Sequence, residues 1–307
     1  MINRVLIRLK VVQIVYAYYK NSGKSIKAAE DEVFFSLSKA YDLYNYLLLL
    51  IVGITHYAAD RIAFKSMKLR PTDSDINPNL KFVNNRFVAQ LEANTKLCKF
   101  AEKSKVNWVD HSDLLRRLLD KIEESESYKE YMSSDTSSYE EDREIWRKLY
   151  KNFIFDNEDL DAILEEQSLY WNDDKSIVDT FVVKTIKRFE ESNGADQELL
   201  PEYKDINDMD FARKLFRSAI TKADEYRALM AENSKNWDMS RFAFMDVVIM
   251  QVALAEIFTF GDIPLNVTLN EYVEIAKYYS TAKSGSFVNG LLDSIIKKLR
   301  EEGVIKK

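Results

Sequence analysis

The sequence has little glycine, proline, cysteine or histidine. Its 307 residues include 7 Gly, 4 Pro, 1 Cys and 2 His. Folds with many strands need tight turns that are rich in Gly and Pro. Because these residues are scarce and long runs of Leu, Ala, Lys and Glu fill the chain, the composition predicts an all-α fold.

The same scarcity excludes several kinds of active site. Cys98 stands alone, so neither a disulfide nor a cysteine-based metal site can form within the chain. His56 and His111 fall in different predicted helices, which argues against a Ser-His-Asp triad and against a histidine-rich metal site. No Gly-rich phosphate loop is present. We therefore expect no enzymatic activity, no metal and no cofactor.

Long hydrophobic runs are also missing. The longest apolar run, Tyr46 to Ile54, is too short to cross a bilayer. The N-terminus alternates basic and apolar residues and does not show the apolar core and cleavage site of a signal peptide. We therefore expect a cytoplasmic protein.

Charge is distributed unevenly along an acidic chain. The net charge is −6, which argues against indiscriminate coating of nucleic acid. The first 29 residues nevertheless carry six basic side chains and no acidic one, whereas residues 121–144 carry nine acids against three bases. This asymmetry permits local binding of an anion by an acidic protein.

Loop-like stretches divide the chain into two predicted regions. The stretch "ESNGADQELLPEYKD" indicates a linker, so we expect an N-terminal helical region over residues 1–204 and a C-terminal helical domain over residues 205–307. The first region is predicted to start with a basic helix over residues 3–20.

The segment "SGSFVNGLLDSIIKKL", residues 284–299, predicts a helix with one core-facing stripe. The stripe has helical spacing and consists of Val288, Leu291, Leu292, Ile295 and Leu299. At about 100° per residue, Gly290 falls almost opposite this stripe and Phe287 falls at its margin. The first turn of a helix also carries free amide donors that can meet an anion. This corner is therefore a candidate contact surface.

Four C-terminal motifs occur in one order: "NWDMSRFAFMD" (236–246), "LAEIF" (254–258), "DIPLNVTLNEYVEIAK" (262–277) and "SFVNGLLDSI" (286–295). Their order and spacing resemble the NusB family of transcription antitermination factors. "DFARKLFRSAITKADEYRALM" (210–230) resembles the helix before these motifs, and "RVLIRLKVVQIVYAYY" (4–19) is similar to the family's opening basic helix. The resemblance covers residues 1–60 loosely and 205–303 well.

The resemblance implies a fold of two packed helical bundles. It also implies binding of boxA-type single-stranded RNA together with the ribosomal protein NusE. This complex joins the RNA polymerase antitermination complex and promotes read-through, notably in ribosomal RNA operons. The middle region, residues 62–204, has no counterpart in a minimal NusB protein, and we expect it to add helices to the N-terminal half.

The resemblance and the chemistry of the residues together predict RNA contacts in two places. They are the opening helix and the start of the last helix, with the residues Arg4, Arg8, Lys10, Lys283, Ser286, Phe287, Asn289 and Gly290. Arginines can contact phosphates and stack on unpaired bases. Taken by themselves, the basic residues could equally form a solvated helix face, Phe287 could seal the core, and Asn289 could bond a neighbouring loop.

The resemblance assigns two further residues, Tyr16 and Glu256, to the NusE interface. An alternative for Glu256 is an intramolecular partner such as a nearby arginine. Two departures from the family pattern are the dilution of N-terminal arginines by Val5, Leu6 and Ile7 and the presence of Gln251 where some members have arginine. They support an alternative function, a NusB-like scaffold or ribosome-assembly protein with weak or no specific RNA binding.

A third function, an RNA-modifying enzyme, follows from NusB-like domains that are fused to RNA methyltransferases. The missing Gly-rich cofactor loop and the missing α/β pattern argue against it. In the middle region, Arg70, Lys81 and Arg86 lie near a predicted loop. They form either an accessory RNA surface or part of a solvated connection.

Overall fold

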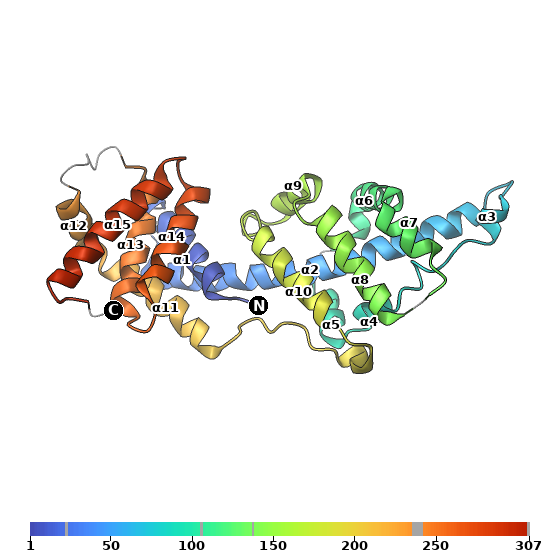
Figure 1. Cartoon of the computed structure of the whole chain (residues 1–307), viewed down its shortest axis with the longest axis horizontal. Coiled ribbons are helices and arrows are strands. Elements are labelled where there is room, and N and C mark those ends of the chain that lie inside the picture. Colours follow the sequence, from blue (N-terminus) through green and yellow to red (C-terminus); the bar gives the residue numbers. More distant parts are fainter. Residues whose placement is uncertain (22–23, 105–106, 137, 235–241, 306–307) are drawn as a thin grey trace. The chain divides into compact units, whose positions relative to one another are not determined.

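The computed structural model describes residues 1–21, 24–104, 107–136, 138–234 and 242–305, and its regular secondary structure is helical (Figure 1). No strand occurs among the described residues. They contain one isolated parallel β-bridge, between Ile2 and Tyr203. The predicted all-α fold is confirmed.

The chain folds into two compact units, which we name by their place in the sequence. The terminal unit contains residues 2–38 and 202–307, and the middle unit contains residues 39–201 together with Met1. This grouping differs from a division into consecutive regions, because the N-terminal helix belongs with the C-terminal helices. The second boundary, between residues 201 and 202, lies close to the predicted linker.

The terminal unit contains α1, the start of α2 and the five C-terminal helices. Their bounds are α1 (Arg4–Lys20), α2 (Ile26–Ser66), α11 (Ile206–Thr221), α12 (Ala223–Asn233), α13 (Phe244–Thr259), α14 (Leu265–Tyr279) and α15 (Ser284–Glu301). Helix α13 is central, because every residue from Val248 to Ile257 is buried. A helix that is apolar on all sides belongs in the core.

Helix α1 packs against α11 and α13, which is why the chain's start joins its end (Figure 1). Its first turn is capped by Asn3, whose side chain accepts a hydrogen bond from the Leu6 amide at 3.0 Å. The preceding residue, Ile2, donates its amide to the carbonyl of Glu202 at 2.7 Å. These contacts hold the first residues of the chain beside the segment that leads into α11.

The middle unit contains the rest of α2 and eight further α-helices among the described residues. They are α3 (Asp73–Ile76), α4 (Arg86–Glu92), α5 (Thr95–Lys103), α6 (Ser112–Glu124), α7 (Glu126–Ser133), α8 (Tyr139–Leu149), α9 (Glu158–Gln167) and α10 (Lys175–Arg188). Aromatic rings fill its core: Tyr46 on α2 stacks on Trp108 with centroids 4.0 Å apart, and Trp146 is fully buried.

Helix α2 is long and apolar enough, by length and composition, to cross a membrane. About half of its apolar window, 44%, is buried inside the protein. Leu43, Leu47 and Ile51 on this helix have no exposed surface, as expected for the core helix of a globular unit.

Candidate nucleic-acid interface

The start of α15 is fixed by a buried serine. The Ser284 hydroxyl donates to Asp246 Oδ2 on α13 at 2.9 Å and accepts from the Thr281 amide at 3.0 Å. Both Ser284 and Asp246 are buried. The first turn of α15 is therefore held against the first turn of α13, and residues beside Ser284 have a defined position.

Phe287 lies on this first turn with its ring partly exposed. Its ring packs against Phe242, with centroids 4.3 Å apart and planes tilted by 47°. Lys283, Ser286, Asn289 and Gly290 around it are exposed. The structure thus brings together five of the predicted RNA-contact residues, all within two turns of one helix.

A second aromatic group is centred on Phe244. Two residues beyond Phe242, the Phe244 ring meets Tyr16 on α1, with centroids 5.5 Å apart, and Tyr19, with centroids 6.0 Å apart. The ammonium of Lys20 lies 4.8 Å from the centroid of the Phe244 ring. The end of α1 therefore meets the start of α13.

We call the surface made by Lys20, Phe242, Phe244, Lys283 and Phe287 the Phe287 face. Its three aromatic rings are partly exposed and its two lysines are exposed. Aromatic faces beside cations are the features with which proteins bind single-stranded nucleic acid, because bases stack on rings and phosphates meet cations. Lys20, Phe242 and Phe244 were missed in the sequence, where the partners of an aromatic side chain cannot be seen.

The two units differ in net charge. The terminal unit has 21 Lys and Arg against 19 Asp and Glu, a net charge of +2, whereas the middle unit has 23 against 31, a net charge of −8. The sequence-wide charge of −6 thus conceals a terminal unit that does not repel an anion.

Arg8 does not lie on an exposed face, contrary to the prediction. Its side chain is buried and donates two hydrogen bonds to Glu256 on α13, from Nε to Oε2 at 2.8 Å and from Nη2 to Oε1 at 2.9 Å. Burial lowers the pKa of Arg8, but the hydrogen bond and charge of Glu256 outweigh it, so the pKa is raised. Arg8 is permanently charged and out of reach of a ligand in this arrangement.

Glu256 is fully buried and receives two further hydrogen bonds. Thr268 Oγ1 donates to its Oε1 at 2.8 Å, and the Tyr272 hydroxyl donates to its Oε2 at 3.0 Å. The intramolecular alternative, an arginine partner, is therefore the one found. Because no surface of Glu256 is exposed, this residue cannot supply a contact to a partner protein in this arrangement.

The other basic residues of α1 differ in exposure. Lys10 is buried at 2% exposure, so it too is removed from solvent. Arg4 keeps 40% of its side chain exposed, although its guanidinium lies 5.0 Å from the Phe211 ring and 3.9 Å from Asp208. Lys20 lies sixteen residues further along α1, about 24 Å at a rise of 1.5 Å per residue. Arg4 is thus separated from the Phe287 face along this helix.

Gln251, a departure from the family pattern, has a structural role. Its amide nitrogen donates to the Tyr19 hydroxyl at 2.9 Å and to the Ala219 carbonyl at 2.7 Å, and its oxygen accepts from Arg227. The residue is fully buried. Gln251 thereby helps to hold Tyr19, whose ring meets Phe244.

The loop residues of the middle unit do not form one basic surface. Lys81 donates to the carbonyls of Ser134 and Thr136 at 2.9 and 2.7 Å, and Arg86 pairs with Glu191 at 2.9 Å. Of the three predicted accessory residues, Arg70 alone is left exposed without a contact of this kind among the described residues.

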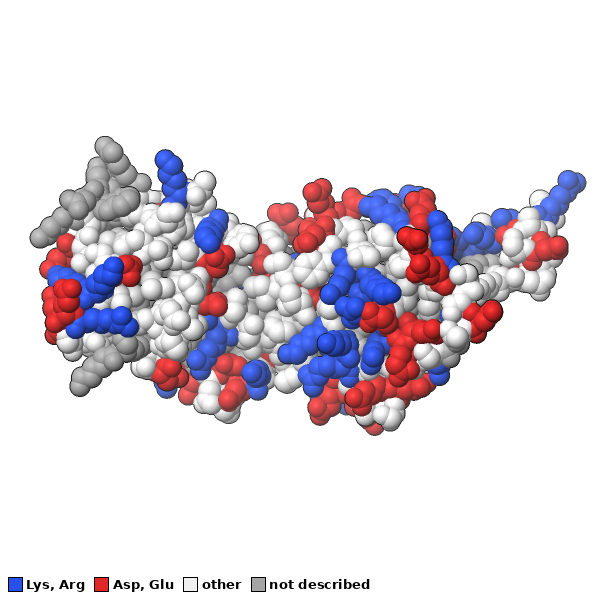
Figure 2. Space-filling model, in the orientation of Figure 1, with Lys and Arg blue, Asp and Glu red and all other residues white. Residues whose placement is uncertain are grey.

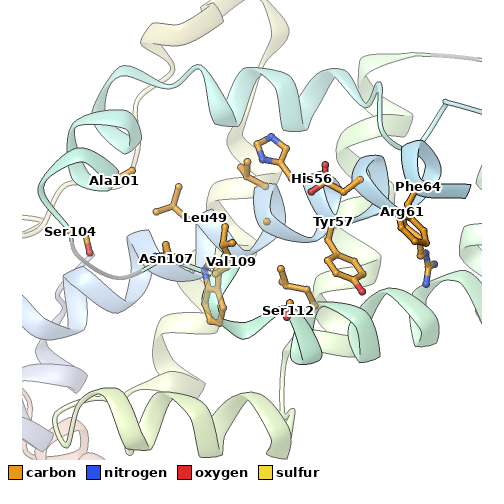
Figure 3. Close-up of a pocket in the computed structure, with 15 residues that line it drawn as sticks. Leu49, His56, Tyr57, Arg61, Phe64, Ala101, Ser104, Asn107, Val109 and Ser112 are labelled. Atoms are coloured by element: carbon orange, nitrogen blue, oxygen red, sulfur yellow. The ribbon is translucent and has the colours of Figure 1, made fainter. Parts of the chain in front are cut away.

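The middle unit also holds a pocket of about 660 Å³ between α2 and the segment that ends α5 and begins α6 (Figure 3). His56, Tyr57 and Phe64 line it from α2. Trp108 and Leu115 also line it. Two of its polar side chains have acidic partners: His56 lies 2.9 Å from Glu92, and Arg61 lies 2.5 Å from Asp120. No group of three metal-ligating side chains occurs there or elsewhere in the described part of the chain.

Comparisons with known proteins identify one family. The model of the NusB family matches residues 180–297, from the second half of α10 into α15. The match therefore begins inside the region predicted to be an insert, and α1 lies outside it. Residues 236–241 of the first motif, which include Trp237 and Arg241, are outside the described residues.

Curated relatives carry the same family name. The "Transcription antitermination protein NusB" of Salinibacter ruber is 35% identical over 132 residues, covering 41% of this chain and 82% of that protein. Those of Dictyoglomus thermophilum and Chloroherpeton thalassium are each 39% identical, over 97 and 103 residues, covering 32% and 34% of this chain.

The matches cover different shares of the relatives themselves. They span 67% of the Dictyoglomus protein and about half, 49%, of the Chloroherpeton protein. No solved structure matches the chain. The matched helices, their motifs and the extent of the Salinibacter match lead to one conclusion: the chain belongs to the NusB family.

Proposed function

We propose that this protein is a non-enzymatic, cytoplasmic transcription antitermination factor that binds boxA-type single-stranded RNA together with NusE. The observation that carries this proposal is the Phe287 face, in a chain whose relatives are named transcription antitermination proteins. Stacking and phosphate contacts are the interactions that an unpaired RNA strand requires.

Within this function, the residues of the Phe287 face have separate roles. Phe287 offers a ring to an unpaired base, while Lys20 and Lys283 offer charge to neighbouring phosphates. Ser286 and Asn289 are exposed hydrogen-bonding groups on the same turn, and Gly290 leaves the helix backbone open. Arg4 is a separate, weaker phosphate contact because Phe211 and Asp208 already engage it.

The partner surface is a distinct part of the proposal. Tyr16 packs on Phe244 and keeps part of its side chain exposed, so it remains a candidate contact for NusE. We expect the Tyr16→Ala variant to lose capture of NusE. In the absence of NusE, the variant should still bind RNA. Loss of RNA binding alone would assign Tyr16 to the Phe287 face instead.

The function is tested by titrating labelled boxA-type RNA with the full chain, with and without NusE, over a salt series. A specific complex weakens as salt rises, with a slope of about −0.7 per phosphate contacted on a single strand. Lys283→Glu should weaken it, whereas Lys222→Glu, an equal charge change on the turn between α11 and α12, should not.

Two outcomes would contradict the proposal. No specific RNA complex at any salt concentration, with NusE still captured, would point to the scaffold function. Equal losses from Lys283→Glu and Lys222→Glu would show that net charge, and not the Phe287 face, controls binding.

A further inference from the structure

Three cations share the outer side of α10 in the middle unit. Lys184, Lys187 and Arg188 are all exposed. At about 100° per residue they fall within about 100° of one another around the helix, so they point to one side. None of the three has a carboxylate within 4.0 Å among the described residues, so their charges are not neutralised by ion pairs.

Helix α8 adds two arginines beside them. Arg143 donates from Nη1 to the carbonyl of Phe189 at 2.7 Å, which places it at the C-terminal end of α10. Arg147, one turn further along α8, is partly exposed and pairs with Glu144. We call the surface made by Arg143, Arg147, Lys184, Lys187 and Arg188 the α10 face. Figure 2 shows Lys and Arg side chains gathered over these two helices.

The lack of an ion pair at Lys184, Lys187 and Arg188, in the described part of the chain, contrasts with other cations of the middle unit. The middle unit has eight more acids than bases, and several of its cations are bound by carboxylates, as in the pairs of Arg61 with Asp120 and Lys175 with Asp179. Cations left unpaired in an acidic unit are available to an external anion.

The chemistry of the α10 face favours nucleic acid over protein. A stable protein interface has an apolar centre. Between residues 139 and 188 the large exposed hydrophobic side chain among the described residues is Leu169, which lies on neither α8 nor α10. Side chains three and four residues apart on a helix are neighbours, so the three α10 cations can meet successive phosphates of one strand.

We propose that the α10 face is a second RNA-binding surface, which contacts the phosphate backbone without reading bases. The proposal rests on the proposed function, since it supplies extra backbone contacts to an RNA that the Phe287 face selects. Backbone contacts of this kind raise affinity in a salt-dependent way and add no sequence preference.

The test compares two charge-matched variants of the full chain on an RNA that extends beyond the boxA-type element. The first variant is Lys184→Glu, Lys187→Glu and Arg188→Glu. The control is Lys65→Glu, Arg70→Glu and Lys121→Glu, which alters three exposed cations of the same unit away from α8 and α10. Both variants change the net charge equally.

The α10 variant should bind the extended RNA about ten-fold more weakly. Its salt slope should be shallower by about 2, which corresponds to three lost phosphates on a single strand. The control should bind like the unchanged chain. Discrimination between matched and scrambled elements should be the same in all three proteins. Since cations in the last turn also stabilise a helix, Lys184→Gln, Lys187→Gln and Arg188→Gln are measured alongside and should show a smaller loss in the same direction.

Each other outcome overturns the inference. Equal losses in the α10 variant and the control would show an effect of net charge alone. Unchanged RNA binding with lost capture of NusE would assign the α10 face to a protein. If the unchanged chain binds RNA specifically and the α10 variant binds it equally well, the inference fails while the proposed function stands. If the unchanged chain binds no RNA, both fail.

Discussion

The guanidinium of Arg8 and the carboxylate of Glu256, 248 residues apart in the sequence, form a buried two-point contact at the centre of the terminal unit. Glu271 lies 3.6 Å from the third nitrogen of the same guanidinium. Because α1 supplies the cation and α13 supplies the anion, the pair fixes how the N-terminal helix docks on the C-terminal helices. A basic residue of the opening helix thus serves folding.

Removing one partner of this pair should destabilise the terminal unit strongly. Arg8→Met leaves the Glu256 carboxylate buried without a cation, which typically costs about 3–5 kcal/mol. Glu256→Gln should cost a comparable amount, and the double variant should cost less than the two single changes added together. Urea denaturation of the four proteins gives the coupling free energy. Additive losses would mean that the two groups do not stabilise one another.

The same variant separates folding from RNA contact. At a temperature where Arg8→Met remains folded, its affinity for boxA-type RNA should stay within about two-fold of the unchanged chain, because Arg8 is buried. A loss on the scale expected for a direct phosphate contact would show that α1 moves and exposes Arg8 when RNA binds.

Phe287→Ala should weaken RNA binding without unfolding the protein. Stacking of a base on an aromatic ring contributes about 1–3 kcal/mol, so the affinity should fall roughly 5- to 150-fold. Phe287→Tyr keeps the ring and should bind nearly as well. Fluorescence anisotropy measures the affinities, and a denaturation curve for each variant checks the fold. Equal affinity of Ala and Tyr variants would exclude stacking at this position.

The helical fold and the core-facing side of α15 could be predicted from the sequence, because helical periodicity is a local signal. Val288, Leu291, Leu292, Ile295 and Leu299 are all buried, and Gly290 is exposed, as the spacing indicated. The predicted corner at Phe287 exists for the same reason: its position relative to the stripe is set by one helix alone.

Other parts of the site depend on partners that the sequence does not reveal. Nothing in the alternation of basic and apolar residues in α1 distinguishes buried Arg8 from partly exposed Arg4, since the difference lies in Glu256 on another helix. The group around Phe244 forms because α1 places Tyr16 and Lys20 against the Phe244 ring. Such contacts follow from packing between distant segments.

The middle unit should lose stability at alkaline pH partly through Tyr46. Burial raises the pKa of Tyr46 to about 12, while a hydrogen bond from Gln167 acts in the opposite direction. Because the pKa is higher in the folded chain than in the unfolded chain, where it is near 10, the stabilising contribution is complete below pH 10 and is lost as pH rises through 12.

Tyr46→Phe should therefore flatten the decline in the free energy of unfolding between pH 10 and 12, by up to about 1.4 kcal/mol per pH unit. Urea denaturation at a series of pH values measures it, and Tyr57→Phe on the same helix controls for the loss of a tyrosine. An unchanged slope in Tyr46→Phe would show that another group titrates there.

Two glycines of α15 should respond differently to the same substitution. A methyl group at Gly285 would lie 2.6 Å from Cγ of Lys277, so Gly285→Ala must displace the lysine side chain and should destabilise the start of the helix. At Gly290 no atom lies within 4 Å of the added group. Because alanine favours a helix over glycine by about 0.5–1 kcal/mol, Gly290→Ala should raise the free energy of unfolding.

If RNA approaches the open backbone at Gly290, that more stable variant should bind boxA-type RNA more weakly than the unchanged chain. Opposite changes in stability and affinity cannot come from damage to the fold, so this substitution tests the contact directly. Ser294→Ala, one turn further along α15 at an exposed position, is the matched control and should leave the affinity unchanged. Unaltered RNA binding by Gly290→Ala would place the RNA away from this turn and restrict the Phe287 face to its aromatic and basic side chains.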